Sequence, residues 1–137
     1  MSGSDHAIEI RLDPFPADAE LAQLSAAAWG EEDGDFAYRK VLRRSLCHVG
    51  AYAGSRLVGH VNVAWDGGEH AFLLDPMVHP DFQRRGIGSA LVRRATGTAR
   101  ARGAVWLHVD YEPHLDGFYK ACGFKPTLAG LMRLRAD

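Results

Sequence analysis

Residues 78–91 carry the sequence Val78-His79-Pro80-Asp81-Phe82-Gln83-Arg84-Arg85-Gly86-Ile87-Gly88-Ser89-Ala90-Leu91. A tight turn at residues 66–68 precedes it and predicts that a strand over residues 71–78 returns antiparallel to the strand before. A helix is predicted over residues 87–102, because apolar side chains recur every four positions there, at Ile87, Leu91, Ala95 and Ala99. The quoted stretch therefore joins a strand to a long helix through a polar loop that contains glycine.

The loop at residues 83–89 is a candidate anion site. Main-chain amides lack partners at a helix N-terminus and lie at the positive end of the helix dipole. Gly86 and Gly88 let an anion reach the backbone, and Arg84 and Arg85 add positive charge. Two glycines alone predict only a turn, but a strand, this loop and a helix in that order favour a phosphate site.

Two other phosphate motifs do not match. The motif G-x-G-x-x-G requires a third glycine where Leu91 stands, and no G-K-[ST] follows with the spacing of a P-loop. The sequence thus disfavours a dinucleotide or triphosphate site.

The remaining elements predict an α+β fold. Alternation at Val105, Leu107 and Val109 predicts a strand that a right-handed crossover places parallel to residues 71–78. Other predicted elements are strands over residues 6–12 and 130–134, a hairpin over residues 48–65, and helices over residues 17–29, 36–46 and 115–122. Together they predict a mostly antiparallel mixed sheet with one central parallel strand-helix-strand unit and helices on both faces.

Composition narrows the class of protein. The 137 residues, 47% of them hydrophobic, suffice for one core, so residues 1–137 are interpreted as a single domain. The formal net charge of -1 argues against nucleic acid or a membrane surface as partner. The absence of a signal sequence or long apolar stretch predicts a cytoplasmic protein. Cys47 and Cys122 are too few for a disulfide framework or a zinc site, so we expect two half-buried thiols and no metal.

The quoted stretch resembles the acyl-CoA signature of GNAT-superfamily N-acetyltransferases, whose Q/R-x-x-G-x-G/A pattern it matches in full. The resemblance extends over most of the chain and is weakest in the N-terminal helices and the last strand. It implies a single GNAT domain in which the amides from Arg84 to Ser89 hold the CoA pyrophosphate, while Val78 pairs with the pantetheine arm between two splayed strands. The implied CoA-binding residues are Val78, Gln83, Arg84, Arg85, Gly86, Ile87, Gly88 and Ser89.

Tyr119 is the candidate general acid. Acyl transfer from a thioester requires a proton for the departing thiolate. Within residues 117–124, Tyr119 resembles the tyrosine that many GNAT members use for this step. Taken alone, a tyrosine is more often a core residue with its hydroxyl at the surface. Many members carry an asparagine seven residues earlier, where this chain has Glu112.

The general base is predicted less directly, because GNAT members use different residues or water. Asp75 is the leading candidate, since a carboxylate within an apolar strand is usually paired or functional. A purely structural carboxylate beside Pro76 is an equally good interpretation. The other candidates are His60, His79, Asp110 and Glu112.

The acceptor is not encoded in the CoA motif. An acidic loop at residues 31–35 suits a cationic acceptor, and Trp29, Phe36 and Tyr38 are candidate pocket residues or core residues. The resulting hypothesis is an acetyl-CoA-dependent N-acetyltransferase acting on a primary amine of a small molecule or peptide. The alternatives are a non-catalytic CoA-binding or sensing module and, less favoured for want of a stacking platform, a nucleic-acid-binding domain. Exposed edge strands also suggest a homodimer.

Overall fold

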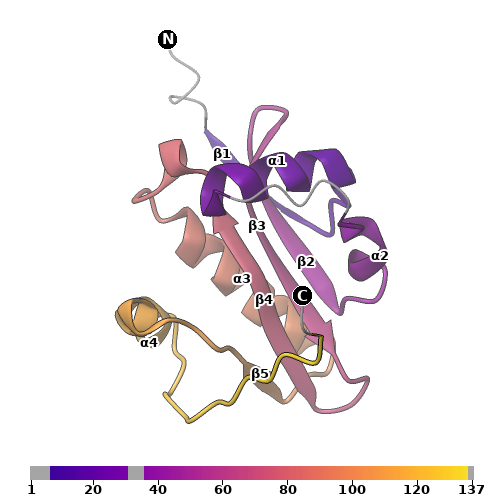
Figure 1. Ribbon diagram of the computed structural model, residues 1–137, viewed down its shortest axis with the longest axis vertical. Coiled ribbons are helices and arrows are strands. Elements are labelled where there is room, and N and C mark those ends of the chain that lie inside the picture. Colours follow the sequence, from indigo (N-terminus) through magenta and orange to yellow (C-terminus); the bar gives the residue numbers. More distant parts are fainter. Residues whose placement is uncertain (1–6, 31–35, 136–137) are drawn as a thin grey trace.

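A computed structural model describes residues 7–30 and 36–135. Their strands form one sheet in the order β1 (Ile8–Leu12), β2 (Cys47–Ala53), β3 (Arg56–Trp65), β4 (His70–Val78) and β5 (Trp106–His108). Neighbouring strands are antiparallel except β4 and β5, which are parallel. The predicted α+β fold with a mostly antiparallel mixed sheet is therefore confirmed (Figure 1).

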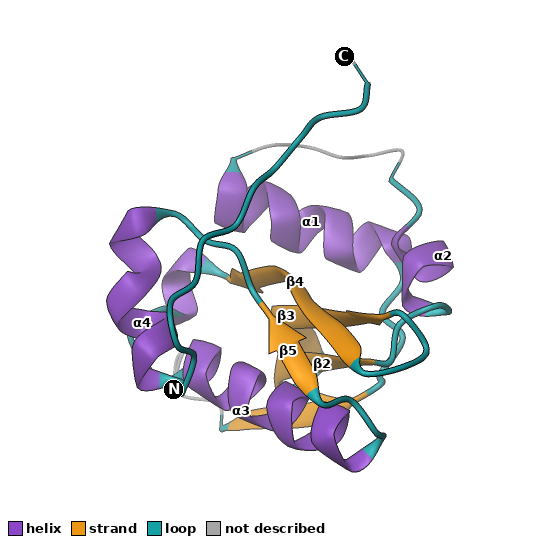
Figure 2. Ribbon diagram, turned by 90° about the horizontal axis from the view of Figure 1, so that it is seen from below, coloured by secondary structure: helices purple, strands orange, loops and turns teal. Residues whose placement is uncertain are grey.

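Helices cover both faces of the sheet. The four α-helices are α1 (Asp18–Trp29), α2 (Tyr38–Leu42), α3 (Ile87–Ala101) and α4 (Asp116–Ala121), and the short 3-10 helices are η2 (Pro80–Phe82) and η3 (Pro113–Leu115). Figure 2 shows α1 on one side of the sheet and α3 on the other. This arrangement confirms the prediction of helices on both faces.

Two buried clusters follow from the alternation of side chains along the strands. Val49, Val61 and Val63 pack against Leu91 and Ala95 of α3. On the opposite face, the side chains of Leu21, Leu24, Tyr52, Leu57 and Met77 pack together beneath α1. Burying one such aliphatic side chain contributes about 1.5–3 kcal/mol relative to leaving it exposed, so these clusters hold both helices on the sheet.

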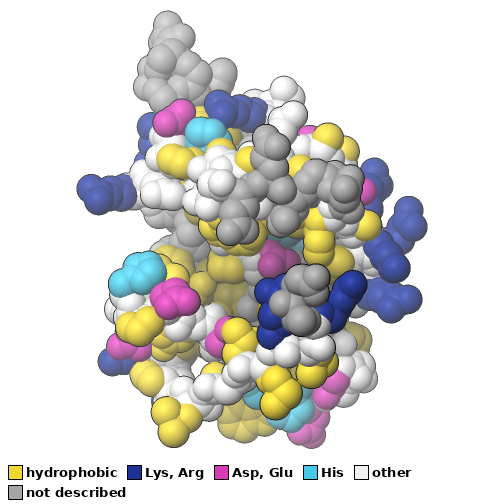
Figure 3. Space-filling model, in the orientation of Figure 1, with side chains coloured by type: hydrophobic (Ala, Val, Ile, Leu, Met, Phe, Trp, Pro, Cys, Tyr) yellow, Lys and Arg dark blue, Asp and Glu magenta, His cyan; other side chains and the backbone are white. Residues whose placement is uncertain are grey.

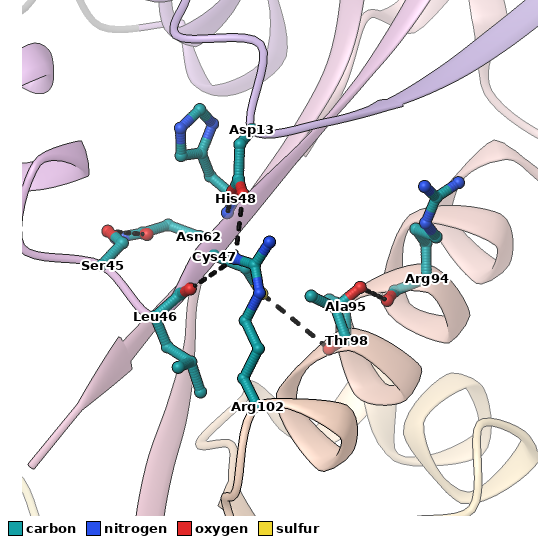
Figure 4. Close-up of polar contacts among 10 residues, drawn as sticks. All are labelled: Asp13, Ser45, Leu46, Cys47, His48, Asn62, Arg94, Ala95, Thr98 and Arg102. Atoms are coloured by element: carbon teal, nitrogen blue, oxygen red, sulfur yellow. Dashed lines mark hydrogen bonds and ion pairs between the residues drawn. The ribbon is translucent and has the colours of Figure 1, made fainter. Parts of the chain in front are cut away.

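The end of α3 is tied to the sheet by one arginine. Arg102 Nη1 donates to Asp13 Oδ2 at 2.9 Å and to the Leu46 carbonyl oxygen at 2.8 Å (Figure 4). Asp13 Oδ1 in turn accepts the His48 main-chain N–H at 2.9 Å. Asp13 adopts a left-handed φ of 50°, a conformation that Asp tolerates better than most residues. These bonds fix where α3 lies on the sheet.

Replacing Arg102 with methionine is expected to lower the free energy of unfolding by about 1–2 kcal/mol, because two charge-assisted hydrogen bonds at a half-exposed site are lost. Urea unfolding measures the effect. The matched control is Arg100→Met on the same helix, at an exposed position, where the change should stay within about 0.5 kcal/mol. Equal losses in both variants would contradict this role of Arg102.

Three predictions about secondary structure are wrong in detail. No strand forms at residues 130–134, because no described strand lies beside them to complete a ladder. The parallel pair therefore lies at the edge of the described sheet and not at its centre. The second helix is shorter than residues 36–46, since α2 spans only Tyr38–Leu42.

The two cysteines differ in burial. Cys122 is half-buried as predicted, whereas Cys47 is fully buried in the core, and burial raises the pKa of the Cys47 thiol to about 11. Among residues 7–30 and 36–135, no helix is long and apolar enough to cross a membrane. The same residues contain no cluster of three metal-ligating side chains.

Candidate functional site

The loop between β4 and α3 has a backbone shaped by two left-handed residues. Arg84 has a φ of 63° and Gly86, the N-cap of α3, a φ of 78°. The first α3 amide bonded to a main-chain carbonyl within the helix is that of Ala90, which donates to the Gly86 oxygen at 3.0 Å. The preceding amides have no acceptor inside the helix and remain available to an anion. The local geometry is that of a main-chain anion site.

A groove of about 590 Å³ begins at this loop and extends to α4 and the end of α1. Figure 3 shows the face hollowed between the α1 and α4 regions, with apolar side chains on its floor. Of the predicted CoA-binding residues, those lining the groove are Val78, Gln83, Arg84, Gly86, Ile87, Gly88 and Ser89.

Arg85 does not line the groove. Its guanidinium lies 5.2 Å from the centre of the Phe82 ring and donates to the Asp81 carbonyl oxygen at 3.2 Å. Gln83 is also engaged, because its side-chain amide donates to the Val78 carbonyl oxygen at 3.1 Å. Arg84 is therefore the loop arginine that lines the groove.

The strands β4 and β5 separate after a short parallel ladder. β4 pairs with β5 only from His70 to Phe72, so the carboxyl half of β4 has no strand partner on that side. A β-bulge interrupts the β3–β4 ladder between the pairs Asn62↔Leu74 and His60↔Met77, and Asp75 within it has a φ of 55°. The bulge bends β4 where it enters the groove.

Tyr119 lines the groove and is almost completely buried, with 2% of its surface exposed. Its ring stacks on Tyr111 with the centroids 4.7 Å apart, and Phe118 and Phe124 pack edge-on against it. Burial raises the pKa of the Tyr119 phenol, and the neighbouring Cys122, Asp110 and Tyr111 add to the shift. The phenol is therefore protonated at neutral pH, as a general acid must be.

The two leading base candidates differ in position. His60 lines the groove with 1% of its surface exposed, and its Nδ1 is buried without a hydrogen-bond partner. Burial, with a smaller contribution from His48, lowers the pKa of His60 to about 3, so its imidazole is neutral at physiological pH. Asp75 is half-buried and is not among the residues that line the groove. Pro76, which adjoins Asp75 in the bulge, does line the groove.

The other base candidates lie outside the groove. His79 Nδ1 accepts the Asp81 N–H at 3.1 Å and its Nε2 lies 3.0 Å from Arg56 Nη2, so both ring nitrogens are engaged. His79 instead lines a separate hollow of about 210 Å³. Asp110 and Glu112 are exposed, and Glu112 precedes η3 without capping it through its side chain.

The end of the groove that faces α1 is mostly apolar. Trp29 lines it, together with Ala28, Pro76, Met77 and His114. Tyr38 belongs to the core, and Phe36 is exposed and packs edge-on against Tyr38. The acidic loop at residues 31–35 lies outside the described residues.

Phe118 is a groove residue that the sequence did not predict, although it adjoins Tyr119 in the aromatic run. A Cβ added to Gly88 would lie 3.4 Å from the Phe118 ring, which is van der Waals contact, so Gly88 packs directly against Phe118 where both residues line the groove.

Comparison with known proteins identifies the family of this chain. The profile of the acetyltransferase (GNAT) family matches residues 7–124, which include the loop, both strands and Tyr119. The chain belongs to the GNAT acetyltransferase family. A probable acetyltransferase from Staphylococcus aureus has the same fold as this GNAT chain, with a TM-score of 0.82, 23% identity, and coverage of 94% of this chain and 99% of that one.

Other relatives are similar over shorter or more divergent stretches. A mycothiol acetyltransferase from Mycolicibacterium vanbaalenii is 35% identical over 80 residues, which are 58% of this chain and 27% of the relative. This GNAT chain thus spans about a quarter of that protein's length. The aminoglycoside N-acetyltransferase AAC(6')-Iy, solved in complex with CoA, shares the fold with a TM-score of 0.72 at 17% identity, covering 96% of each chain.

The buried histidines are expected to make the GNAT domain less stable in acid. Burial lowers the pKa of His48 and, more strongly, of His60. The unfolded chain therefore binds protons below pH about 6.5 that the folded chain excludes, and stability falls as the pH drops from about 6.5, by up to about 1.4 kcal/mol per pH unit per histidine. Urea unfolding between pH 7 and 4 should give a shallower slope for His60→Leu than for the wild type. His114→Leu, at an exposed position, should keep the wild-type slope, and an unchanged slope in His60→Leu would contradict the assignment.

Proposed function

We propose that this chain transfers the acetyl group of acetyl-CoA to a primary amine of a small molecule or peptide. The observation that carries the proposal is a single groove joining the main-chain anion site at the start of α3 to the buried phenol of Tyr119. The CoA complex of a protein with the same fold supports the choice of donor.

The residues of the groove fit an acyl-CoA. The main-chain amides from Arg84 to Ser89 would donate hydrogen bonds to the pyrophosphate, and Arg84 would add positive charge. Phe118 and Val78, which line the groove beside Gly88, would contact the pantetheine arm. The carboxyl half of β4, which lacks a strand partner there, would offer main-chain groups to the amides of that arm.

The chain's contribution to the reaction is to position two reactants and to move protons. The amine nitrogen attacks the thioester carbonyl carbon, a C–N bond forms, and the C–S bond breaks. Tyr119 Oη gives its proton to the sulfur as the thiolate departs. The proton that the amine loses passes to His60 or Asp75, directly or through water. Exchange with solvent then returns a proton to Tyr119.

The test is release of free thiol from acetyl-CoA in the presence of aminoglycosides, polyamines, amino acids and peptides. We expect release that depends on both the protein and one class of amine, with an acetylated amine as product. Saturable binding of acetyl-CoA without acetylation of any amine would instead indicate the non-catalytic CoA-binding module. Absence of CoA binding would contradict the proposal altogether.

Two amide variants separate the candidate bases. His60→Gln is expected to lower kcat about 10-fold at neutral pH, because His60 lines the groove and its neutral ring can hydrogen-bond to the amine or to a water that carries the amine's proton. Asp75→Asn is expected to change kcat less than about threefold, and asparagine tolerates the left-handed backbone of the bulge. Steady-state kinetics with the best amine measure both. A larger loss in Asp75→Asn would transfer the role to Asp75.

A further inference from the structure

Three buried polar side chains, which we term the polar row, lie on one face of β2 and β3. Val49 and Val61 belong to the core cluster beneath α3, so alternation along the strands directs their neighbours His48, His60 and Asn62 to the opposite face. Each member of the polar row is only 1% exposed. Figure 4 shows the His48 ring and the Asn62 side chain on the side of the strands turned away from α3.

Most nitrogen atoms of the polar row have no hydrogen-bond partner in the protein. They are both ring nitrogens of His48, Nδ1 of His60 and Nδ2 of Asn62. Asn62 Oδ1, by contrast, accepts the Ser45 hydroxyl. Buried polar groups are rarely left without a partner, and an internal water with about three hydrogen bonds is a common solution. The polar row therefore offers the donors and acceptors of an internal water site.

The two ring nitrogens of His60 face different surroundings. Nδ1 is enclosed by the protein, while the residue lines the groove, so Nε2 is the nitrogen turned to the groove. Burial lowers the pKa of His60 to about 3 and also lowers the pKa of His48, so both rings are neutral at neutral pH. A neutral imidazole carries one N–H and one lone pair. Nε2 can accept a proton in the groove only while the hydrogen of the ring is on Nδ1.

The tautomer with the hydrogen on Nδ1 needs an acceptor inside the protein, because a buried N–H is seldom left without one. The His48 ring is placed to provide it, since its centroid lies 6.4 Å from that of His60. The directly bonded rings of His70 and His108 have centroids 5.0 Å apart. The longer separation between His48 and His60 fits two hydrogen bonds through one water, each about 2.8 Å long.

Asn62 supplies a third group for the same water. It pairs directly with His48 across the β2–β3 ladder, and side chains at such opposed positions are close neighbours. The water would accept hydrogen bonds from His60 Nδ1–H and Asn62 Nδ2, and donate one to the lone pair of His48. This arrangement gives the water about the three bonds that are typical of a buried site.

We propose that His48 is a positioning residue that, through an internal water shared with Asn62, keeps the hydrogen of His60 on Nδ1 and leaves the lone pair of Nε2 facing the groove. The inference rests on the proposed function for the role of His60 as proton acceptor. When Nε2 takes the proton of the amine, the ring becomes a cation whose Nδ1–H stays bonded to the water. Nε2 later releases that proton to solvent in the groove, so Nδ1 keeps its hydrogen throughout.

The experiment reads the tautomer of His60 by nitrogen NMR of the isotope-labelled full chain at neutral pH, without acetyl-CoA or amine. His60→Gln assigns the signals. We expect a hydrogen-bearing Nδ1 and a bare Nε2 in the wild type. In His48→Leu the hydrogen should move to Nε2, and kcat should fall about 10-fold, as in His60→Gln. His48→Gln, whose amide oxygen can accept from the water, should keep the wild-type tautomer and a kcat within about threefold.

Cys47→Ala is the matched control, because Cys47 adjoins His48 in β2 but belongs to the core beneath α3. It should keep the wild-type tautomer and a kcat within about twofold. The double variant His48→Leu/His60→Gln should be no slower than His60→Gln alone, since both residues act on one proton.

Three results would overturn the role of His48. They are a wild-type His60 with its hydrogen on Nε2, a His48→Leu variant that keeps the hydrogen on Nδ1, and additive losses of kcat in the double variant. The first needs no change at His48, so it does not depend on the folding of a variant. It is also read without substrates, so it stands apart from any failure of the chain to acetylate an amine.

Discussion

Replacing Tyr119 with phenylalanine is expected to lower kcat at least about 100-fold while leaving the affinity for CoA within about threefold. The substitution removes one oxygen atom and keeps the ring, which packs against Tyr111, Phe118 and Phe124. Without the phenol the thiolate must leave unprotonated or draw a proton from water. Steady-state assays of thiol release measure kcat, and calorimetry measures the affinity for CoA.

Tyr111→Phe is the matched control for Tyr119→Phe. The Tyr111 ring stacks on Tyr119, but its hydroxyl donates to Asp116 Oδ1 at 2.9 Å and it does not line the groove. We expect its kcat to stay within about threefold of the wild type. Loss of CoA binding with unchanged turnover in Tyr119→Phe would mean that Tyr119 positions the cofactor and does not donate a proton.

The second large effect is expected at Gly88. A Cβ at Gly88 already reaches van der Waals contact with the Phe118 ring, so the methyl groups of valine would displace Phe118 and reshape the groove beside the loop. We expect the Kd for acetyl-CoA to rise about 100-fold, which corresponds to about 2.7 kcal/mol. Isothermal titration calorimetry measures this change directly.

Gly97→Val is the control for Gly88→Val, because Gly97 lies on the exposed side of the same helix and a Cβ there would meet nothing within 4 Å. Its Kd should match that of the wild type. If Gly88→Val bound acetyl-CoA normally, the contact between Gly88 and Phe118 would have no part in shaping the CoA site.

Features encoded in short stretches could be predicted from the sequence. The left-handed N-cap at Gly86 and the helix after it depend on neighbouring residues, so the loop and its position were predicted correctly. Tyr119 was predicted from the resemblance of residues 117–124 to GNAT members, and the structure brings it to the same groove as the loop. Whether these residues bind CoA and transfer a proton stays a prediction.

Features that depend on contacts between distant strands could not be predicted. His60 lines the groove and Asp75, in the bulge, does not, although Pro76 within a strand was a signal of an irregularity. Neither β4 nor β5 alone predicts that they separate early, and only the family resemblance implied two splayed strands. Residues 130–134 have the pattern of a strand, but a strand also needs a neighbouring strand, and none pairs with them among the described residues.

The short ladder between β4 and β5 also has a thermodynamic consequence. The two strands separate after Phe72↔His108, and a molecule that occupies the gap between them binds the native state alone. By mass action, such a molecule at 100 times its Kd adds about 2.7 kcal/mol to the free energy of unfolding. The melting temperature of the purified chain, measured at increasing acetyl-CoA concentrations, therefore reports donor binding without any acceptor present.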